Sequence, residues 1–292
     1  MHYFEQKPED NTFTLLMVDL THRCNMECSN CYIPNREIPD MEVKPLYEFL
    51  KKLPDRITIR LIGAEATVRK DLPDIFRNVR QCGHKVSLTT NGLKLASKNY
   101  TRNLKNAGLR MVLLSMNGAD NPDVYGIIDG GTEYANMKVK ALENCMNQNM
   151  IINTGTIIAK GCNEFTFSDQ VNLVRKKMKE TSYKSKIKPI LRFRSVGKLG
   201  RYMEDSSYSL PEMEEQFKYY IGDVDSIEEI TPYHHGIFTN FYEMEDMFVR
   251  LVDWSVDDEG VPDSENEFRG RITPDWKIAP FFEHVKLNEF GY

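Results

Sequence analysis

The residues best suited to chemistry are three cysteines within eight positions, Cys24, Cys28 and Cys31. They follow directly on the apolar run 14–20, which predicts a strand. Thiolates are the usual protein ligands of iron–sulfur clusters. A four-iron cluster held by three cysteines keeps one iron open, and an open metal position is typical of a site that binds a substrate or cofactor. The spacing therefore predicts one [4Fe–4S] cluster with a vacant corner.

A structural zinc site formed by these cysteines and His22 is the alternative. It is disfavoured because an adjacent His-x-Cys pair has awkward ligand geometry and no second ligand pair follows. The other cysteines, Cys82, Cys145 and Cys162, are too scattered for a second cluster. A tight cysteine group in a long chain indicates a reducing compartment rather than a secreted disulfide scaffold, and we expect a cytoplasmic protein.

Composition narrows the class of protein. The 292 residues include 38 Lys+Arg and 43 Asp+Glu, a net charge of −5, and the apolar content of 41% is enough for a hydrophobic core. The mild acidity argues against dedicated nucleic-acid binding. No apolar run reaches membrane-spanning length, and the first residues have neither the basic start nor the apolar stretch of a signal peptide. We therefore expect no membrane association.

Residues 13–196 alternate short apolar runs with helical patterns. The predicted strands are 14–20, 56–62, 84–90, 109–116, 150–159 and 189–196. The predicted helices are 41–53, 71–82, 96–107, 132–149 and 164–178. Such βα repeats with short loops indicate an α/β fold with a parallel sheet, either doubly wound or a partial barrel. In a barrel, chemistry takes place at the carboxyl ends of the strands.

The pattern changes near residue 200. Residues 201–292 are richer in acids and aromatics, with helices expected at 211–220 and 242–252 and a hairpin at 269–281. We interpret 1–200 as the core and 201–292 as a C-terminal α+β cap and substrate-binding extension.

The CxxxCxxC spacing of Cys24, Cys28 and Cys31 after a first strand resembles the radical S-adenosylmethionine (SAM) superfamily. The resemblance implies a partial (β/α)6 TIM barrel, with the amino and carboxylate groups of SAM on the open iron. It also implies an electron donor such as flavodoxin or ferredoxin. Reductive cleavage of SAM would then give a 5′-deoxyadenosyl radical, which abstracts a hydrogen atom from the substrate.

Later motifs at successive strand ends are similar to those of the same superfamily. Gly63-Ala64-Glu65 resembles its GGE motif, Thr90-Asn91-Gly92 its TNG turn, and Ser115-Met116-Asn117-Gly118 its S-x-D-G element. The resemblance implies SAM contacts at the following positions: Asn30, Tyr32, Gly63, Ala64, Glu65, Ser115, Asn117, Thr156 and Val196. The carboxylate of Glu65 is suited to the SAM ammonium.

The candidate substrate-binding residues lie in the last predicted core strand and in the tail. Arg192 and Arg194 alternate on one strand face and could hold a carboxylate or phosphate; a solvated edge is the competing interpretation. His235 could transfer a proton, although a surface loop is favoured. The tail is weakly similar to a SPASM or twitch extension without its cysteines, which favours a peptide or protein side chain as substrate. A small metabolite, nucleotide or sugar is the first alternative, and a non-catalytic iron–sulfur or zinc protein is the second.

Overall fold

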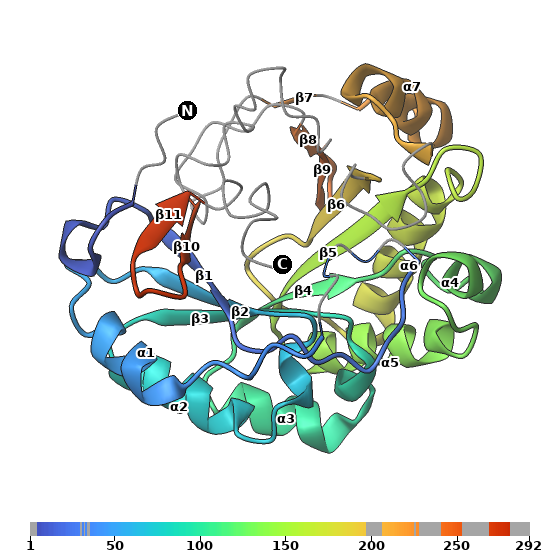
Figure 1. The fold of residues 1–292 in the computed structure, drawn as a ribbon. Coiled ribbons are helices and arrows are strands. Elements are labelled where there is room, and N and C mark those ends of the chain that lie inside the picture. Colours follow the sequence, from blue (N-terminus) through green and yellow to red (C-terminus); the bar gives the residue numbers. More distant parts are fainter. Residues whose placement is uncertain are drawn as a thin grey trace.

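A computed structural model describes residues 5–29, 31, 33, 36–196, 206–224, 226–227, 241–252 and 269–280. One sheet runs through all of these parts, in the order β11-β10-β1-β2-β3-β4-β5-β6-β9-β8-β7 (Figure 1). Its core strands are β1 (Leu15–Asp19), β2 (Thr58–Ile62), β3 (Lys85–Thr90), β4 (Met111–Ser115), β5 (Ile151–Ile158) and β6 (Ile190–Ser195). These six pair in parallel, each with the next in sequence.

Helices follow the core strands and cover the outer face of the sheet (Figure 1). They are α1 (Val43–Leu50), α2 (Leu72–Gln81), α3 (Lys98–Asn106), α4 (Pro122–Ile128), α5 (Tyr134–Asn147), α6 (Thr166–Glu180) and α7 (Leu210–Ile221). Three short 3-10 helices lie at Pro8–Asp10, Ala66–Val68 and Leu93–Ala96. The predicted α/β class with a partial barrel is confirmed. Helix α4 was not predicted, although Asn121 caps it and Pro122 begins it.

Alternate strand residues face opposite sides of the sheet, and burial shows which side is which. Leu16 and Val18 of β1 and Ile59 and Leu61 of β2 belong to the same apolar core as Phe76 of α2. The core therefore lies between the sheet and the helices. The intervening strand residues point to the concave side of the sheet, which we call the inner face.

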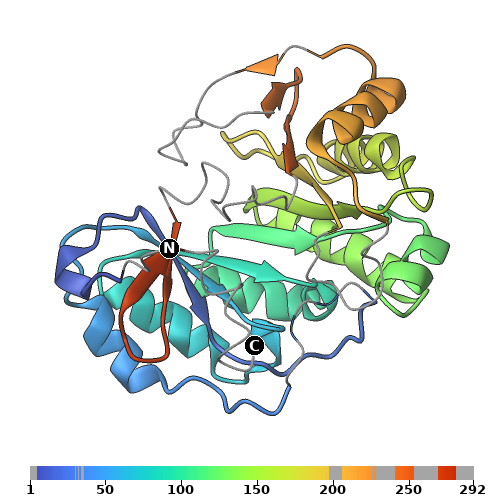
Figure 2. The ribbon, with the colours of Figure 1, turned by 45° about the horizontal axis from the view of Figure 1, so that its top comes forward.

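The described strands of the tail extend the sheet at both edges. Strand β9 (Phe248–Val252) pairs in parallel with β6, and β8 (Phe241–Glu243) and β7 (Ser226–Ile227) follow it. At the other edge, β10 (Arg269–Ile272) pairs in parallel with β1 and in antiparallel fashion with β11 (Ile278–Pro280). Figure 2 shows β10–β11 and β7–β9 on opposite sides of the molecule, and no described pairing joins β11 to β7. Over its described strands the barrel is therefore open.

The structure corrects one prediction for the tail and confirms another. Residues 242–252 are not a helix: residues 242–243 belong to β8 and residues 248–252 to β9, whose near-continuous apolar run is largely buried in the sheet. The hairpin predicted at 269–281 is present as β10 and β11. Helix α7 packs on α6 through Phe217 and Phe167, whose ring centroids are 5.7 Å apart. The core and tail boundary at residue 200 stays a prediction.

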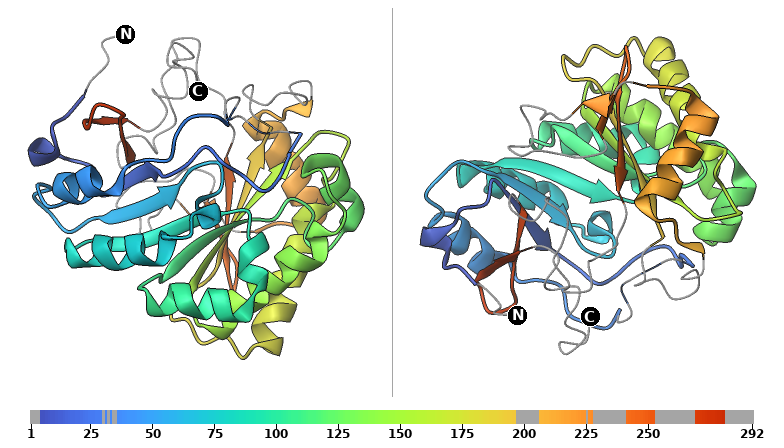
Figure 3. Two further views of the ribbon diagram at one scale, coloured as in Figure 1. Left: turned by 60° about the horizontal axis from the view of Figure 1, so that its bottom comes forward. Right: turned by 90° about the horizontal axis from the view of Figure 1, so that it is seen from above.

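Figure 3 shows the helices along one side of the sheet, seen from below and from above. Among the described residues, no helix combines the length and the apolarity needed to span a bilayer.

Candidate functional site

The cysteine loop leaves the carboxyl end of β1 and is fixed by a polar anchor. The Thr21 hydroxyl donates to Asp40 Oδ1 at 2.6 Å and accepts from the Arg23 backbone N–H at 3.1 Å. The Arg23 guanidinium donates to the same carboxylate. This pairing lowers the pKa of Asp40 below its ordinary value. The chain just before Cys24 therefore has a fixed path.

The three candidate ligand thiols lie on this loop, half-buried and without disulfides. Arg36 donates to the Sγ of Cys31 at 3.1 Å, and its guanidinium also interacts with Cys24. Burial, followed by the negative charge of Asp129, raises the pKa of the Cys28 thiol to about 12. A bound metal ion would favour the thiolate form of such a thiol.

The three thiols are connected through Cys28 and Arg36. Cys28 interacts electrostatically with Cys24 and with Cys31, and Arg36 interacts with both of those cysteines. In the described part of the chain, no group of three His, Cys, Asp or Glu side chains could hold a single metal ion. In a four-iron cluster each thiolate would bind a different iron.

The segment after β2 is paired to the cysteine loop through its backbone. The N–H of Ala64 donates to the Thr21 carbonyl at 2.8 Å, and the N–H of Glu65 donates to the Arg23 carbonyl at 3.1 Å. Gly63 has a φ of +139°, and a Cβ there would lie 2.4 Å from the Thr21 carbonyl oxygen. Only glycine permits this approach. The backbone of residues 63–65 thus lies against the start of the cysteine loop.

The Glu65 carboxylate, 1% exposed, joins the ends of β2 and β3. Its Oε1 accepts from the Thr67 N–H at 2.9 Å and from the Thr90 hydroxyl at 2.8 Å, and its Oε2 accepts from the Asn91 N–H at 2.6 Å. These donors belong to the chain itself. In the structure Glu65 is therefore an anchor for the 90–93 turn, and its contact with SAM stays a prediction.

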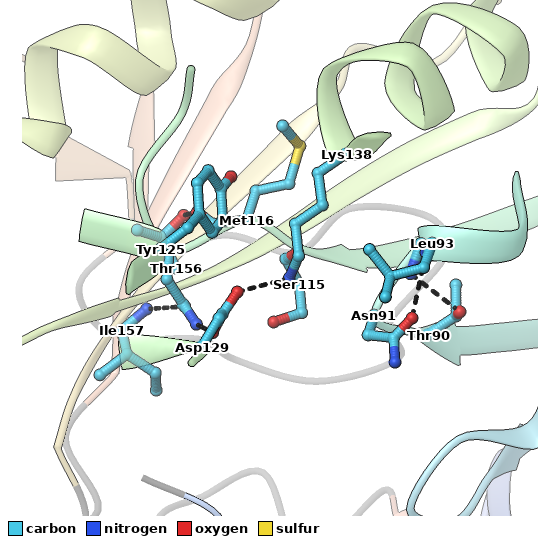
Figure 4. A network of polar contacts seen from close by, with 12 residues as sticks. Thr90, Asn91, Leu93, Ser115, Met116, Tyr125, Asp129, Lys138, Thr156 and Ile157 are labelled. Carbon is cyan, nitrogen blue, oxygen red and sulfur yellow. Dashed lines mark hydrogen bonds and ion pairs between the residues drawn. The ribbon is translucent and has the colours of Figure 1, made fainter. Parts of the chain in front are cut away.

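Asn91 connects this turn to the cysteine loop. Its Nδ2 donates to Asn25 Oδ1 at 2.8 Å and lies 3.9 Å from the Sγ of Cys24, while its Oδ1 accepts from the Leu93 N–H (Figure 4). Gly92 completes the turn with a φ of +85°. The sequence singled out the Asn-Gly pair as a turn but not the contact of Asn91 with the loop.

A buried ion pair lies next to the end of α4, where the cysteine loop packs. Lys138 of α5 and Asp129 are each 1% exposed and 2.7 Å apart (Figure 4). Lys138 also donates to the Ser115 carbonyl at 2.9 Å. The backbone N–H and hydroxyl of Ser29 donate to the carbonyls of Ile128 and Ile127, so the loop rests on the end of α4. The sequence analysis missed this pair, since no local motif marks it.

Asn117 and Thr156 are engaged within the protein. Asn117 donates to Asp129 Oδ1 at 2.6 Å and accepts from the Ile157 N–H at 2.9 Å, and the Thr156 hydroxyl donates to the Met116 carbonyl at 2.8 Å. Both are buried, which fits a role in joining β4 to β5. Within the described residues nothing engages the Ser115 hydroxyl, which is half-buried at the rim. Their contacts with SAM stay predictions.

Three of the remaining candidate residues lie in β6 or directly after it, and the other three lie outside the described residues. Val196 is buried at the end of β6, and Arg192 is 2% exposed, so it does not lie on a solvated edge. Arg194 is half-buried on the same face of β6. Asn30, Tyr32 and His235 lie outside the described residues.

Comparisons with known proteins agree with this geometry. A sequence model of the "Radical SAM superfamily" matches residues 18–175, more than half of the chain. The chain is 34% identical over 143 residues to the 7,8-dihydro-6-hydroxymethylpterin dimethyltransferase of Methanocaldococcus jannaschii, covering 46% of this chain and 28% of that protein. It is 28% identical over 215 residues to a probable GTP 3′,8-cyclase of Pyrococcus abyssi, covering 70% and 65%. The chain thus spans less than two thirds of each of these relatives.

Solved structures show the same fold. Streptococcus suis SuiB bound to S-adenosylmethionine has a TM-score of 0.64 with 14% identity, covering 94% of this chain and 61% of that one. Members of the matched family bind a [4Fe–4S] cluster and S-adenosylmethionine. The thiol loop, the paired rim segments and the match over residues 18–175 together place this chain in the radical SAM superfamily.

Proposed function

We propose that this protein is a radical SAM enzyme that modifies a small metabolite, nucleotide or sugar. The observation that carries the proposal is the loop after β1, which holds three half-buried thiols, with Cys28 in electrostatic interaction with Cys24 and Cys31, at the carboxyl rim of the sheet. These three thiolates would hold a [4Fe–4S] cluster. With SAM bound, the cluster supplies one-electron cleavage to methionine and a 5′-deoxyadenosyl radical, which takes a hydrogen atom from the substrate.

The chain's own contribution is to position these groups. Arg36 places a positive charge against the sulfurs, which offsets the charge of the thiolates. The backbone of Gly63 and Ala64 comes close to the loop without side-chain obstruction. The Ser115 hydroxyl stays available to a ligand. Asn30, Tyr32, Glu65, Asn117, Thr156 and Val196 remain predicted SAM contacts.

The comparisons favour a small substrate over the peptide that the tail suggests. The matching relatives are named for GTP cyclisation and for methylation of a pterin, both small molecules. SuiB has been solved with a precursor peptide, but at 13% identity that likeness carries the fold alone. A soluble electron donor such as flavodoxin or ferredoxin and a cytoplasmic location remain part of the proposal.

The test is anaerobic reconstitution of the full chain with iron and sulfide, followed by dithionite and SAM. We expect bound iron and formation of 5′-deoxyadenosine by the wild type and by Cys162→Ala, a control outside the loop. A Cys24→Ala, Cys28→Ala, Cys31→Ala triple variant should do neither. Formation of 5′-deoxyadenosine by the triple variant would refute the ligand assignment. Its absence from the wild type would support a non-catalytic protein.

The substrate class is tested separately with deuterated candidates. Transfer of deuterium into 5′-deoxyadenosine from a nucleotide or sugar would support the proposal. Transfer of deuterium from peptides alone would instead support a peptide substrate.

A further inference from the structure

The turn that follows α4 packs against the cysteine loop next to Cys28. The backbone N–H of Ser29 donates to the Ile128 carbonyl at 2.9 Å, and the Ser29 hydroxyl donates to the Ile127 carbonyl at 2.8 Å. Ser29 directly follows Cys28 in the sequence. The loop is therefore fixed on this turn immediately after the second of its three thiols.

A second contact fixes the residue before Cys28. Gly130 has a φ of +85°, and a Cβ at this position would lie 2.8 Å from the Glu27 carbonyl oxygen. The two backbones thus touch at a point that has no room for a side chain. Residues 27 and 29 of the loop contact residues 127, 128 and 130 of the turn, so Cys28 and Asp129 each stand between contact residues.

The Asp129 carboxylate has a fixed place in this turn. One of its oxygens accepts from Asn117 Nδ2 at 2.6 Å, and the other lies 2.7 Å from the ammonium of Lys138. Lys138 also donates to the Ser115 carbonyl at 2.9 Å, and its ammonium lies 5.2 Å from the centroid of the Tyr125 ring (Figure 4). Both charges of the pair are therefore buried and have defined positions.

Stability alone does not explain a buried ion pair, because apolar residues of similar volume often serve equally well. The two charges also act unequally on the neighbouring thiol. Asp129 belongs to the segment that contacts the loop, whereas Lys138 reaches the pair from α5, and the electrostatic effect of Asp129 on Cys28 is the larger of the two. Because the pair is withdrawn from water, this effect is weakly screened. The net potential of the pair at Cys28 is therefore negative.

We propose that Asp129, held in place by Lys138, lowers the reduction potential of the iron–sulfur cluster through Cys28. This inference rests on the proposed function, because it requires the cluster that Cys24, Cys28 and Cys31 would bind. A fixed negative charge close to a cluster disfavours the state that carries one more electron, since net charge and neighbouring groups set the potential. A lower potential makes the reduced cluster a stronger one-electron donor, which suits cleavage of the SAM sulfonium. Asp129 is thus a positioning residue.

The test is a redox titration of the anaerobically reconstituted full chain without SAM. Dithionite is the reductant, and the EPR signal of the reduced cluster is the readout. We expect Asp129→Asn to raise the ratio of reduced to oxidised cluster at a fixed potential about tenfold, an upward shift of about 59 mV in the midpoint potential. Asp123→Asn removes the same charge from an exposed position of α4, and its midpoint should equal that of the wild type.

Asp129→Asn leaves the Lys138 ammonium buried without its carboxylate, so a second variant controls for stability. Asp129→Asn combined with Lys138→Met removes both charges and should unfold at a higher urea concentration than either single variant. Because the effect of Asp129 at Cys28 exceeds that of Lys138, the midpoint potential of the double variant should still lie above that of the wild type. The shift should be smaller than in Asp129→Asn.

An unchanged or lower midpoint potential in the double variant, or in Asp129→Asn, would overturn the proposal. Loss of iron by both variants would do the same, since the pair would then act by holding the loop and not through its charge. Failure of the wild type to bind iron would refute the ligand assignment and this inference with it. Iron binding without cleavage of SAM would refute the proposed function, while the redox titration would still decide the role of Asp129.

Discussion

Lys138 of α5 and Asp129 form a 2.7 Å ion pair in which each side chain is only 1% exposed. The pair lies behind the loop of Cys28, because Ser29 donates to the carbonyls of Ile127 and Ile128, just before Asp129. The charges of both residues act on the Cys28 thiol. Helix α5 and the cysteine loop are thus linked through buried charge.

Lys138→Met should destabilise the protein strongly. It leaves the Asp129 carboxylate buried without its cation, which costs about 3–5 kcal/mol of unfolding free energy. Urea denaturation measures this loss. Lys140→Met, at an exposed position of the same helix, is the matched control and should change stability by less than about 0.5 kcal/mol. A loss below about 1 kcal/mol for Lys138→Met would show that the pair is not structurally important.

Glu65→Gln should loosen the rim between β2 and β3. The carboxylate accepts from three donors, Thr67 N, Thr90 Oγ1 and Asn91 N, and a glutamine would turn an amide donor towards one of them. We expect a loss of about 1–3 kcal/mol in urea denaturation and weaker SAM binding in equilibrium dialysis. Glu48→Gln, an exposed change in α1, should affect neither quantity.

Gly63→Ala should be far more damaging than Gly83→Ala. Both glycines have positive φ, but a Cβ at Gly63 would lie 2.4 Å from the Thr21 carbonyl oxygen, whereas one at Gly83 meets nothing within 4 Å. The Gly83 variant measures backbone strain alone, about 1–2 kcal/mol. We expect Gly63→Ala to cost at least about 2 kcal/mol more and to reduce iron binding after reconstitution. Equal losses of unfolding free energy would contradict the close approach.

The ion pair of Asp71 with Arg69 should stabilise the protein at neutral pH and lose this effect in acid. The hydrogen bond from Arg69 lowers the pKa of Asp71 in the folded protein, so the ionised form is stabilised. The contribution is therefore complete above the unfolded pKa of about 4 and is lost as the pH falls through the folded value. Because the Asp71 side chain is 45% exposed, we expect at most about 1 kcal/mol.

The measurement is the difference in unfolding free energy between wild type and Asp71→Asn at several pH values. The difference should be largest at pH 7 and shrink below about pH 4. A difference that stays constant down to about pH 2.5 would mean that Asp71 acts through packing and neutral hydrogen bonds.

The repeated βα pattern was readable because apolar periodicity and turn residues are local properties. Residues 85–90 illustrate this, since Val86 and Leu88 alternate with polar residues and Asn91-Gly92 follows, which gives a strand and its turn. The run Phe248–Val252 misled the prediction because nearly continuous apolar residues suit a buried strand and a helix alike.

The sequence indicated the strand ends that carry the candidate residues, but not the groups that those residues contact. The backbone of Ala64 and Glu65 lies against the start of the cysteine loop, while the contacts of the motif residues with a cofactor stay predictions. Which donors occupy the Glu65 oxygens depends on the neighbouring strand, and strand order is not local information. The same holds for Arg60, whose neighbours Arg192 and Arg194 come from a strand some 130 residues later.

The pairing of Asp19 with Arg271 joins residues 252 positions apart, and β10 completes the hydrogen bonding of β1. During synthesis on the ribosome, β1 is made well before β10. One edge of β1 therefore has no native partner until β10 has emerged, and such an unpaired edge can recruit strands from other chains. Closing this contact late also makes slow refolding the natural outcome, since long-range pairing is entropically costly.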